Sequence, residues 1–299
     1  MNGVINVYKP EGMTSQDVCA KLRKRLHIKK IGHTGTLDPM ATGVLPVCIG
    51  KATRIIEYYG NDIKSYHAGM KLGMTSDTLD ITGEILETAD VSQISENAVR
   101  EAFSNYIGRV MQMPPKYSAL KVDGKRAYEL AREGKSFELE ARPVEIYSNE
   151  ITKLDLNEGI IEFNVSCSKG TYIRTICDDI GRTLGCGAVM SSLERTGSGY
   201  FTKDNAIELE RLIEMSDEEI AERLIPMEVT LVNLGKAELD DNRARAFING
   251  NSSVPRCFKI TEETKFENCY RVYSGGRFLG IGATAPEGIV PIKVINADN

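Results

Sequence analysis

The segment from Gly32 to Gly43, GHTGTLDPMATG, holds the residue best suited to do chemistry, Asp38. Its glycines permit close approach of the backbone and positive φ angles, and Pro39 stiffens the turn directly after the aspartate. A carboxylate held in this way can act as a nucleophile, a general base or a turn residue. The last role is the commonest for an aspartate in a glycine-rich loop, so this segment alone does not assign a reaction.

The residue patterns argue against phosphate-binding and metal sites. The loop around Asp38 lacks the GxxxxGK[ST] pattern and contains no lysine, which argues against a phosphate-binding loop. The three histidines form no HxxxH or HxE pair, and the seven cysteines form no CxxC pair. We therefore expect no metal and no nucleotide or other cofactor.

Two further segments place charged and aromatic side chains beside predicted helix starts. KPEGMTS carries Lys9 in a turn that leads into a helix. SKGTYIRT places Lys169, Tyr172 and Arg174 where a strand meets a helix, and main-chain amides at a helix start favour anions. Taken alone, each segment is better explained by ordinary turn and surface residues.

The elements that must position these residues are predicted from apolar spacing and turn residues. Strands are predicted at 3–8, 43–50, 64–73 and 161–170. Helices are predicted from Ser15, as the capping residue, to about His27, and at 51–59, 95–107, 171–185 and, with an acidic face, 206–223. Residues 31–43 hold three glycines and one proline, so we expect them to be irregular.

Two domains are expected from the length of 299 residues and from a boundary near 228–236. Residues 1–230 mix strands and helices without regular βαβ alternation, which favours an α+β domain with a mixed or antiparallel central sheet and flanking helices. Residues 231–299 hold short strands around a glycine-rich turn, which suggests a small β-barrel.

Charge is unevenly distributed along the chain. The net charge is −5, but residues 1–60 carry +5 and residues 204–230 carry −7. A local field rather than the total charge steers a polyanion, although both stretches are also explained as solvated helix faces. No apolar run approaches the roughly 18 residues of a membrane span, and the first residues lack a signal-peptide layout. We expect a cytoplasmic protein that does not contact a membrane.

Four motifs occur together and in order: KPxGxTS at 9–15, GHTGTLDPxATG at 32–43, YSALKxxG at 117–124 and SKGTYIR at 168–174. In this combination the chain resembles the bacterial pseudouridine synthases that modify position 55 in the TΨC arm of transfer RNA. The resemblance covers essentially the whole chain. It is most specific at the Asp38 loop and weaker after about residue 231, where the tail resembles the PUA domain, a small RNA-binding barrel.

The resemblance implies three catalytic residues. Asp38 matches the family's catalytic aspartate, Tyr66 matches a tyrosine that packs against the target base, and Arg174 matches an arginine that pairs with the catalytic carboxylate. Uridine would be isomerised to pseudouridine after being flipped out of the folded arm.

RNA contacts are implied for a second group of residues. His33 matches a histidine that takes the place of the extruded base, and Tyr172 matches a neighbouring aromatic of the pocket. Lys9 lies in the motif beside the site, and we add Lys169 from the strand–helix junction. Residues 114–142 match an insertion that grips the RNA arm.

The sequence thus predicts a monomeric enzyme that isomerises uridine in tRNA. One alternative is an RNA-binding or RNA-chaperone protein without turnover, which an assay for pseudouridine would distinguish. Another is a small-molecule hydrolase that uses Asp38, but the sequence offers neither a clear carboxylate pair nor a metal cluster.

Overall fold

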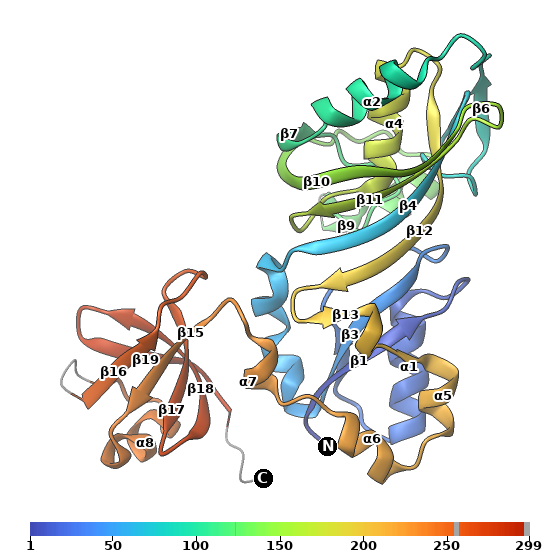
Figure 1. The fold of residues 1–299 in the computed structure, drawn as a ribbon. Helices are drawn as coiled ribbons and strands as arrows, with labels where there is room; N and C mark the ends of the chain where they lie inside the picture. The colour runs from blue at the N-terminus through green and yellow to red at the C-terminus, as the bar shows by residue number, and fades with distance from the viewer. Residues whose placement is uncertain (123, 254–256, 296–299) are drawn as a thin grey trace. The chain divides into compact units, whose positions relative to one another are not determined.

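The computed structural model describes residues 1–122, 124–253 and 257–295, and the chain divides into two compact units (Figure 1). The first unit comprises Met1–Pro39, Gly43–Asp62 and Ser198–Asn299, and the second comprises Met40–Thr42 and Ile63–Gly197. Strands and helices mix in both without regular βαβ alternation, so the expected α+β class is confirmed. Within the described ranges, no helix is both long and apolar enough to cross a membrane.

The second unit is built on a sheet with the strand order β12-β4-β11-β10-β7. Its strands are β4 (Lys64–Leu72), β7 (Gly108–Gln112), β10 (Arg142–Asp155), β11 (Ile160–Cys167) and β12 (Ala188–Ser198). The ladders from β4 through β11 and β10 to β7 are antiparallel. The strands predicted at 64–73 and 161–170 are therefore confirmed.

Helices α2 (Glu96–Asn105) and α4 (Ile173–Thr183) pack on this sheet (Figure 1). The rings of Phe103 in α2 and Phe163 in β11 meet edge to face, with centroids 5.1 Å apart, and both side chains are buried. Both helices were predicted, and the position of α4 matters because Arg174 lies in its first turn.

Shorter elements complete the second unit. They are a hairpin of β5 (Met74–Ser76) and β6 (Ile85–Thr88), and, within the predicted insertion 114–142, the pair β8 (Lys121–Val122) and β9 (Lys125–Arg126), followed by α3 (Ala127–Arg132).

In the first unit, β1 (Gly3–Lys9) has both a parallel and an antiparallel neighbour. Strand β1 runs antiparallel to β3 (Thr42–Ile49) and parallel to β14 (Ile207–Glu208), while β2 (Ile31–His33) adds to β3. Between the second unit and β14 come β13 (Phe201–Thr202) and the 3₁₀ turn η2 (Lys203–Asn205). The predicted mixed central sheet is thus confirmed.

The helices of the first unit are α1 (Ser15–Leu26), the 3₁₀ helix η1 (Gly50–Asn61), α5 (Leu209–Glu214), α6 (Asp217–Arg223) and α7 (Met227–Thr230). Helix α1 buries Val18, Leu22 and Leu26 at helical spacing against the apolar residues of β1, β3 and α5. The predicted acidic helix at 206–223 is instead the short strand β14 followed by two short helices.

Three local predictions were wrong in detail. The cap of α1 is Thr14, which exchanges hydrogen bonds with Asp17, so Ser15 is released for another contact. Residues 31–33 form a strand despite the glycine-rich context, because they complete a ladder with β3. The helix predicted at 51–59 is a 3₁₀ helix, in keeping with its β-branched residues.

The tail forms a five-stranded sheet in the order β16-β15-β17-β18-β19, with helix α8 (Asp241–Ile248) packed on it. The strands are β15 (Gly235–Leu239), β16 (Phe258–Glu262), β17 (Cys269–Ser274), β18 (Arg277–Ala285) and β19 (Gly288–Val294). Of the strands in the described part of the chain, β16 and β19 end the order, and no ladder joins them into a closed barrel.

The tail also packs against η1 of the same unit. Tyr58 and Tyr59 share one buried cluster with Phe278 and Ile281, and Lys293 Nζ lies 2.8 Å from the Glu57 carboxylate. The expected boundary at residues 230 and 231 falls inside the first unit, between α7 and β15. An RNA-binding domain at 231–299 stays a prediction.

Candidate active site

Asp38 lies half-buried on the irregular stretch between β2 and β3. Its neighbour Leu37 is buried, with 3% of its surface exposed. The loop is therefore anchored in the first unit beside the aspartate and does not project freely into solvent.

Ser15 holds the loop before Asp38. Its Oγ accepts a hydrogen bond from the Leu37 amide at 2.8 Å and lies 3.3 Å from the Leu37 carbonyl oxygen, to which it can donate. Because Thr14 caps α1, the Ser15 hydroxyl serves this contact between residues 22 positions apart.

Lys9 holds the loop after Asp38. The Pro39 carbonyl accepts hydrogen bonds from the Gly12 amide at 2.8 Å and from Lys9 Nζ at 3.3 Å. The same ammonium donates to the carbonyls of Pro10 at 2.8 Å and Met13 at 2.6 Å, and the Lys9 side chain is 0% exposed. A buried ammonium with three carbonyl partners joins the KPEGM turn to the Asp38 loop, and the predicted RNA contact of Lys9 stays a prediction.

His33 ends β2, directly before the bend that leads to Asp38. The ring is half-buried, and its Nε2 lies 3.2 Å from Nε2 of Gln16 on α1. Since the tautomer of the ring decides which nitrogen donates, this contact orients the imidazole without assigning its proton.

The remaining predicted residues, Tyr66, Lys169, Tyr172 and Arg174, lie in the second unit. Tyr66 is buried on β4, with 7% of its surface exposed, and pairs in register with Val165 of β11. Lys169 is exposed on the turn between β11 and α4.

Tyr172 is the residue that precedes α4, and its main chain is fixed by Gln112 of β7. The Gln112 side chain donates to the Tyr172 carbonyl at 3.1 Å and accepts from the Tyr172 amide at 2.7 Å. Tyr172 and Lys169 also line one pocket of about 290 Å³ with Gln112 and Arg142. Gln112 could not be predicted as a site residue, because nothing in its spacing indicates a partner 60 residues away.

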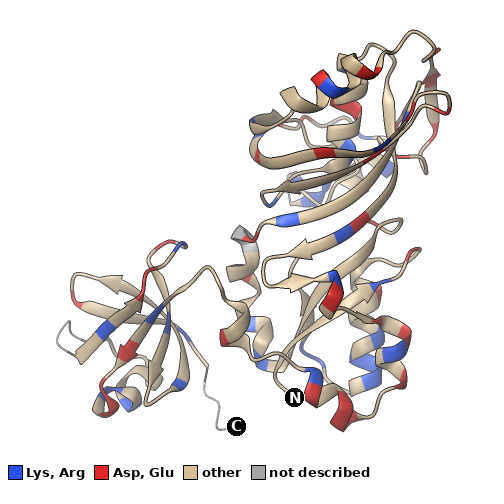
Figure 2. Ribbon diagram, viewed as in Figure 1, with Lys and Arg blue, Asp and Glu red and all other residues tan. Residues whose placement is uncertain are grey.

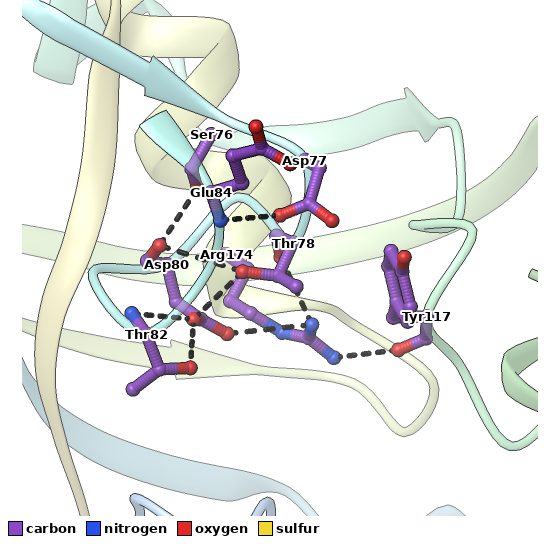
Figure 3. Close-up of polar contacts among 8 residues, drawn as sticks. All are labelled: Ser76, Asp77, Thr78, Asp80, Thr82, Glu84, Tyr117 and Arg174. Atoms are coloured by element: carbon purple, nitrogen blue, oxygen red, sulfur yellow. Dashed lines mark hydrogen bonds and ion pairs between the residues drawn. The ribbon is translucent and has the colours of Figure 1, made fainter. Parts of the chain in front are cut away.

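Arg174 is buried, with 5% of its surface exposed, and its guanidinium has several acceptors in its own unit (Figure 3). One nitrogen donates to the Thr78 carbonyl at 3.0 Å and another to the Tyr117 carbonyl at 3.0 Å. The Asp80 carboxylate lies 3.5 Å away. The loop after β5 and the YSALK motif both contribute these contacts, and together they fix the orientation of the planar guanidinium.

Asp80 is a buried carboxylate that the sequence analysis did not single out. Its Oδ1 accepts hydrogen bonds from the Thr82 amide at 3.0 Å, the Thr82 hydroxyl at 2.6 Å and the Thr78 hydroxyl at 2.8 Å, while Oδ2 faces Arg174 (Figure 3). The only signal was an aspartate with a threonine two residues away on either side, a pattern typical of turns. Its partner Arg174 is 94 positions further along the chain.

The basic and acidic stretches meet within the first unit. In Figure 2 the basic residues gather on α1, while acidic residues mark α5 and α6. Arg25 of α1 lies 2.7 Å from the Asp217 carboxylate and also donates to the Ile213 carbonyl at 2.9 Å. One basic side chain of this stretch is therefore paired with an acidic residue of the same unit, which reduces the local positive charge.

Two protein-family models match the chain. The model described as "TruB family pseudouridylate synthase (N terminal domain)" matches residues 23–173, and the model described as "tRNA pseudouridylate synthase B C-terminal domain" matches residues 174–232. The first match contains Asp38, Tyr66 and Tyr172, and the second begins at Arg174.

Individual relatives extend the similarity to nearly the full length. The chain is 44% identical over 295 residues to the tRNA pseudouridine synthase B of Clostridium tetani (strain Massachusetts / E88), covering 99% of this chain and 100% of the relative. It is 46% identical over 296 residues to that of Clostridium novyi (strain NT), with coverage of 99% and 100%. A chain in the solved structure of a Cbf5-Nop10-Gar1 complex has a TM-score of 0.76 and 26% identity, covering 98% of this chain and 84% of that one.

Proposed function

This chain belongs to the TruB family of pseudouridylate synthases, and from that membership we propose that it converts uridine to pseudouridine at position 55, in the TΨC arm of tRNA, with Asp38 as the catalytic carboxylate. The observation that carries the assignment of Asp38 is the support of its loop. Hydrogen bonds from segment 9–15 hold the main chain both before and after the aspartate.

The reaction breaks the N1–C1′ glycosidic bond, turns the uracil and joins its C5 to C1′. It is an isomerisation and needs no group donor or net redox change. The carboxylate either attacks C1′ or removes the proton at C2′, and in both cases it must be ionised and held in one place. A loop fixed on either side of Asp38 meets the second requirement.

Arg174 is proposed to pair with the Asp38 carboxylate in the reacting enzyme. A planar guanidinium can hold a carboxylate by two parallel hydrogen bonds, which sets direction as well as charge. The main-chain acceptors at Thr78 and Tyr117 and the carboxylate of Asp80 support this role, because they fix the guanidinium before any substrate binds.

The target base is proposed to leave the RNA stack. Flipping costs a few kcal/mol, which contacts to the extruded base and to the vacated space must offset. His33 would fill the vacated space, and Tyr66 would pack against the face of the uracil. Tyr172 and Lys169 would line the edge of the pocket. The contact of His33 with Gln16, which orients the ring, supports the first of these roles.

RNA binding outside the pocket is proposed for two regions. The insertion 114–142 would grip the T arm, and the tail 231–299 would act as a PUA-like RNA-binding module. The enzyme would work as a monomer without a cofactor, in the cytoplasm where its tRNA substrate is found.

The test is to incubate the purified full-length chain with a tRNA transcript and to map pseudouridine along it. We expect modification at position 55, none in a transcript with cytidine at that position, and none with the Asp38→Asn variant. Tight tRNA binding by the wild-type chain without pseudouridine would instead support an RNA chaperone. Modification confined to other positions would overturn the assignment of the T arm.

A further inference from the structure

Arg195, on β12, has the largest side chain among those that are essentially fully buried, with 0% of its surface exposed. Removing a guanidinium from water is costly unless its donors are satisfied. None of the roles proposed above uses Arg195, although it lies in the second unit with Tyr66 and Arg174. A guanidinium buried in this position needs a hydrogen-bond acceptor, and its role in the enzyme is still to be assigned.

The partner is Tyr66. Strands β12 and β4 are neighbours in the sheet, and Gly69 of β4 lies against Ser191 and Ser192 of β12. Tyr66 lies three residues before that glycine, and Arg195 lies three residues after Ser192. The two side chains are hydrogen-bonded. Burial lowers the pKa of Arg195, and the contact with Tyr66 acts in the opposite direction.

This contact constrains the proton of the tyrosine. A guanidinium has only donors, so the Tyr66 oxygen must accept the hydrogen bond from Arg195. The hydroxyl proton must then point away from Arg195, and the adjacent positive charge makes the O–H group a stronger donor. Because both side chains are buried, water competes little for either group.

We propose that Arg195 is a positioning residue that acts through Tyr66. It holds the phenol ring in place and directs the Tyr66 hydroxyl as a hydrogen-bond donor toward a carbonyl oxygen of the detached uracil. The inference rests on the proposed function, because the uracil is the acceptor. It assigns Tyr66 a polar task in addition to packing against the base, and it makes that task dependent on a residue that does not touch the substrate.

The experiment is a double-mutant cycle with the full-length chain and a tRNA transcript, using Tyr66→Phe, Arg195→Met and the double variant. Single-turnover rates at saturating enzyme, tRNA affinity and melting temperature are measured for each. We expect each single variant to react roughly 10–100-fold more slowly, with affinity within about threefold of wild type. The double variant should be no slower than the slower single variant, because both changes remove the same hydrogen bond.

Two further variants separate positioning from simple stability. Arg195→Lys retains a donor and should recover a rate within about tenfold of wild type, even if its melting temperature falls. Phe163→Leu, on the neighbouring strand β11, should lower the melting temperature through its packing with Phe103 and leave the rate of the folded enzyme unchanged. If Arg195→Met does not fold, Arg195→Lys and Tyr66→Phe still report the rate.

Multiplicative rate losses in the double variant, or a folded Arg195→Met enzyme with a normal rate, would overturn the proposal. Failure of the wild-type chain to make pseudouridine would overturn the proposed function instead. The melting temperatures test the hydrogen bond between Tyr66 and Arg195 independently of activity. Tyr66→Phe removes the acceptor of the Arg195 hydrogen bond. The double variant should therefore lose less stability than the two single variants lose together. Strict additivity of the losses would show that the pair does not interact.

Discussion

Asp38 and Asp80 are both aspartates on short loops, but their loops are held in opposite ways. Around Asp38, hydrogen bonds reach the main chain at Leu37 and Pro39. Around Asp80, they reach the carboxylate, whose Oδ1 accepts three hydrogen bonds from its own loop while Oδ2 lies 3.5 Å from Arg174. Main-chain contacts therefore support the first loop on both sides of its aspartate, whereas the carboxylate itself supports the second loop.

Asp38 is therefore held by the main-chain contacts of its loop. Asp80, in contrast, organises its loop, because its carboxylate accepts the hydrogen bonds that fix the loop. Replacing Asp38 leaves the hydrogen bonds to the Leu37 and Pro39 main chain in place, so we expect its replacement to report mainly on chemistry. Replacing Asp80 should also disturb its loop, because the carboxylate lone pairs satisfy buried donors.

Asp38→Asn should give the largest loss of turnover. Asparagine keeps the shape of the side chain but is neither a nucleophile nor a base, so the single-turnover rate should fall at least about 10³-fold, or about 4 kcal/mol. The melting temperature and tRNA affinity should stay close to those of the wild type, because Ser15 and Lys9 hold the loop through its main chain. A rate within about tenfold of wild type would remove Asp38 from the chemistry.

Arg174→Lys should be the next most severe change. Lysine keeps the charge but cannot match the planar fork that reaches the carbonyls of Thr78 and Tyr117 and faces Asp80. We expect a rate loss of about 10²-fold with little change in affinity, since misplacing a reacting group costs about this much. Single-turnover kinetics of the variant would test this, and a normal rate would show that only the charge matters.

Asp80→Asn should lower both stability and rate. The amide cannot replace both carboxylate oxygens, so the threonine donors and Arg174 lose part of their support. We expect a loss of about 2–4 kcal/mol in the free energy of unfolding and of about tenfold in rate. Asp90→Asn is the matched control, because Asp90 makes a similar turn contact with Ser92 at an exposed position. Equal effects of the two changes would refute an organising role for Asp80.

Lys9→Met should act mainly on stability. Methionine fills a similar volume but leaves the carbonyls of Pro10, Met13 and Pro39 without the ammonium, at a cost of about 2–3 kcal/mol in urea unfolding. The rate should fall only severalfold, because Gly12 still holds Pro39. Lys21→Met, at an exposed position on α1, should change neither quantity.

Ser15→Ala should give the smallest effect. It removes the Oγ contacts with the Leu37 main chain and should cost about 1 kcal/mol of stability in denaturant unfolding, with a rate within about threefold of wild type. A loss of rate as large as that of Asp38→Asn would show that this flank of the loop controls the chemistry rather than assisting it.

Local patterns predicted much of the fold. Apolar residues at helical spacing placed α1, α2 and α4, and alternating or continuous apolar runs placed β1, β3, β4 and β11, because burial of one face depends mainly on residues close in the chain. Details that depend on distant partners were missed. Residues 31–33 became a strand because they pair with residues 47–49 of β3, and Ser15 bonds Leu37 because Thr14 takes the cap.

The sequence by itself determined that Asp38 lies in an irregular loop, that Tyr66 lies on a strand and that Arg174 lies at the start of a helix, because glycine, proline and apolar spacing act over a few residues. The tertiary structure alone decided what these residues touch. Arg174 meets the Thr78 carbonyl and Asp80 from far along the chain, and Tyr66 meets Arg195 through the pairing of two strands. Such partners are selected by the need to satisfy buried donors and charges, and that need arises only when separate segments are packed together.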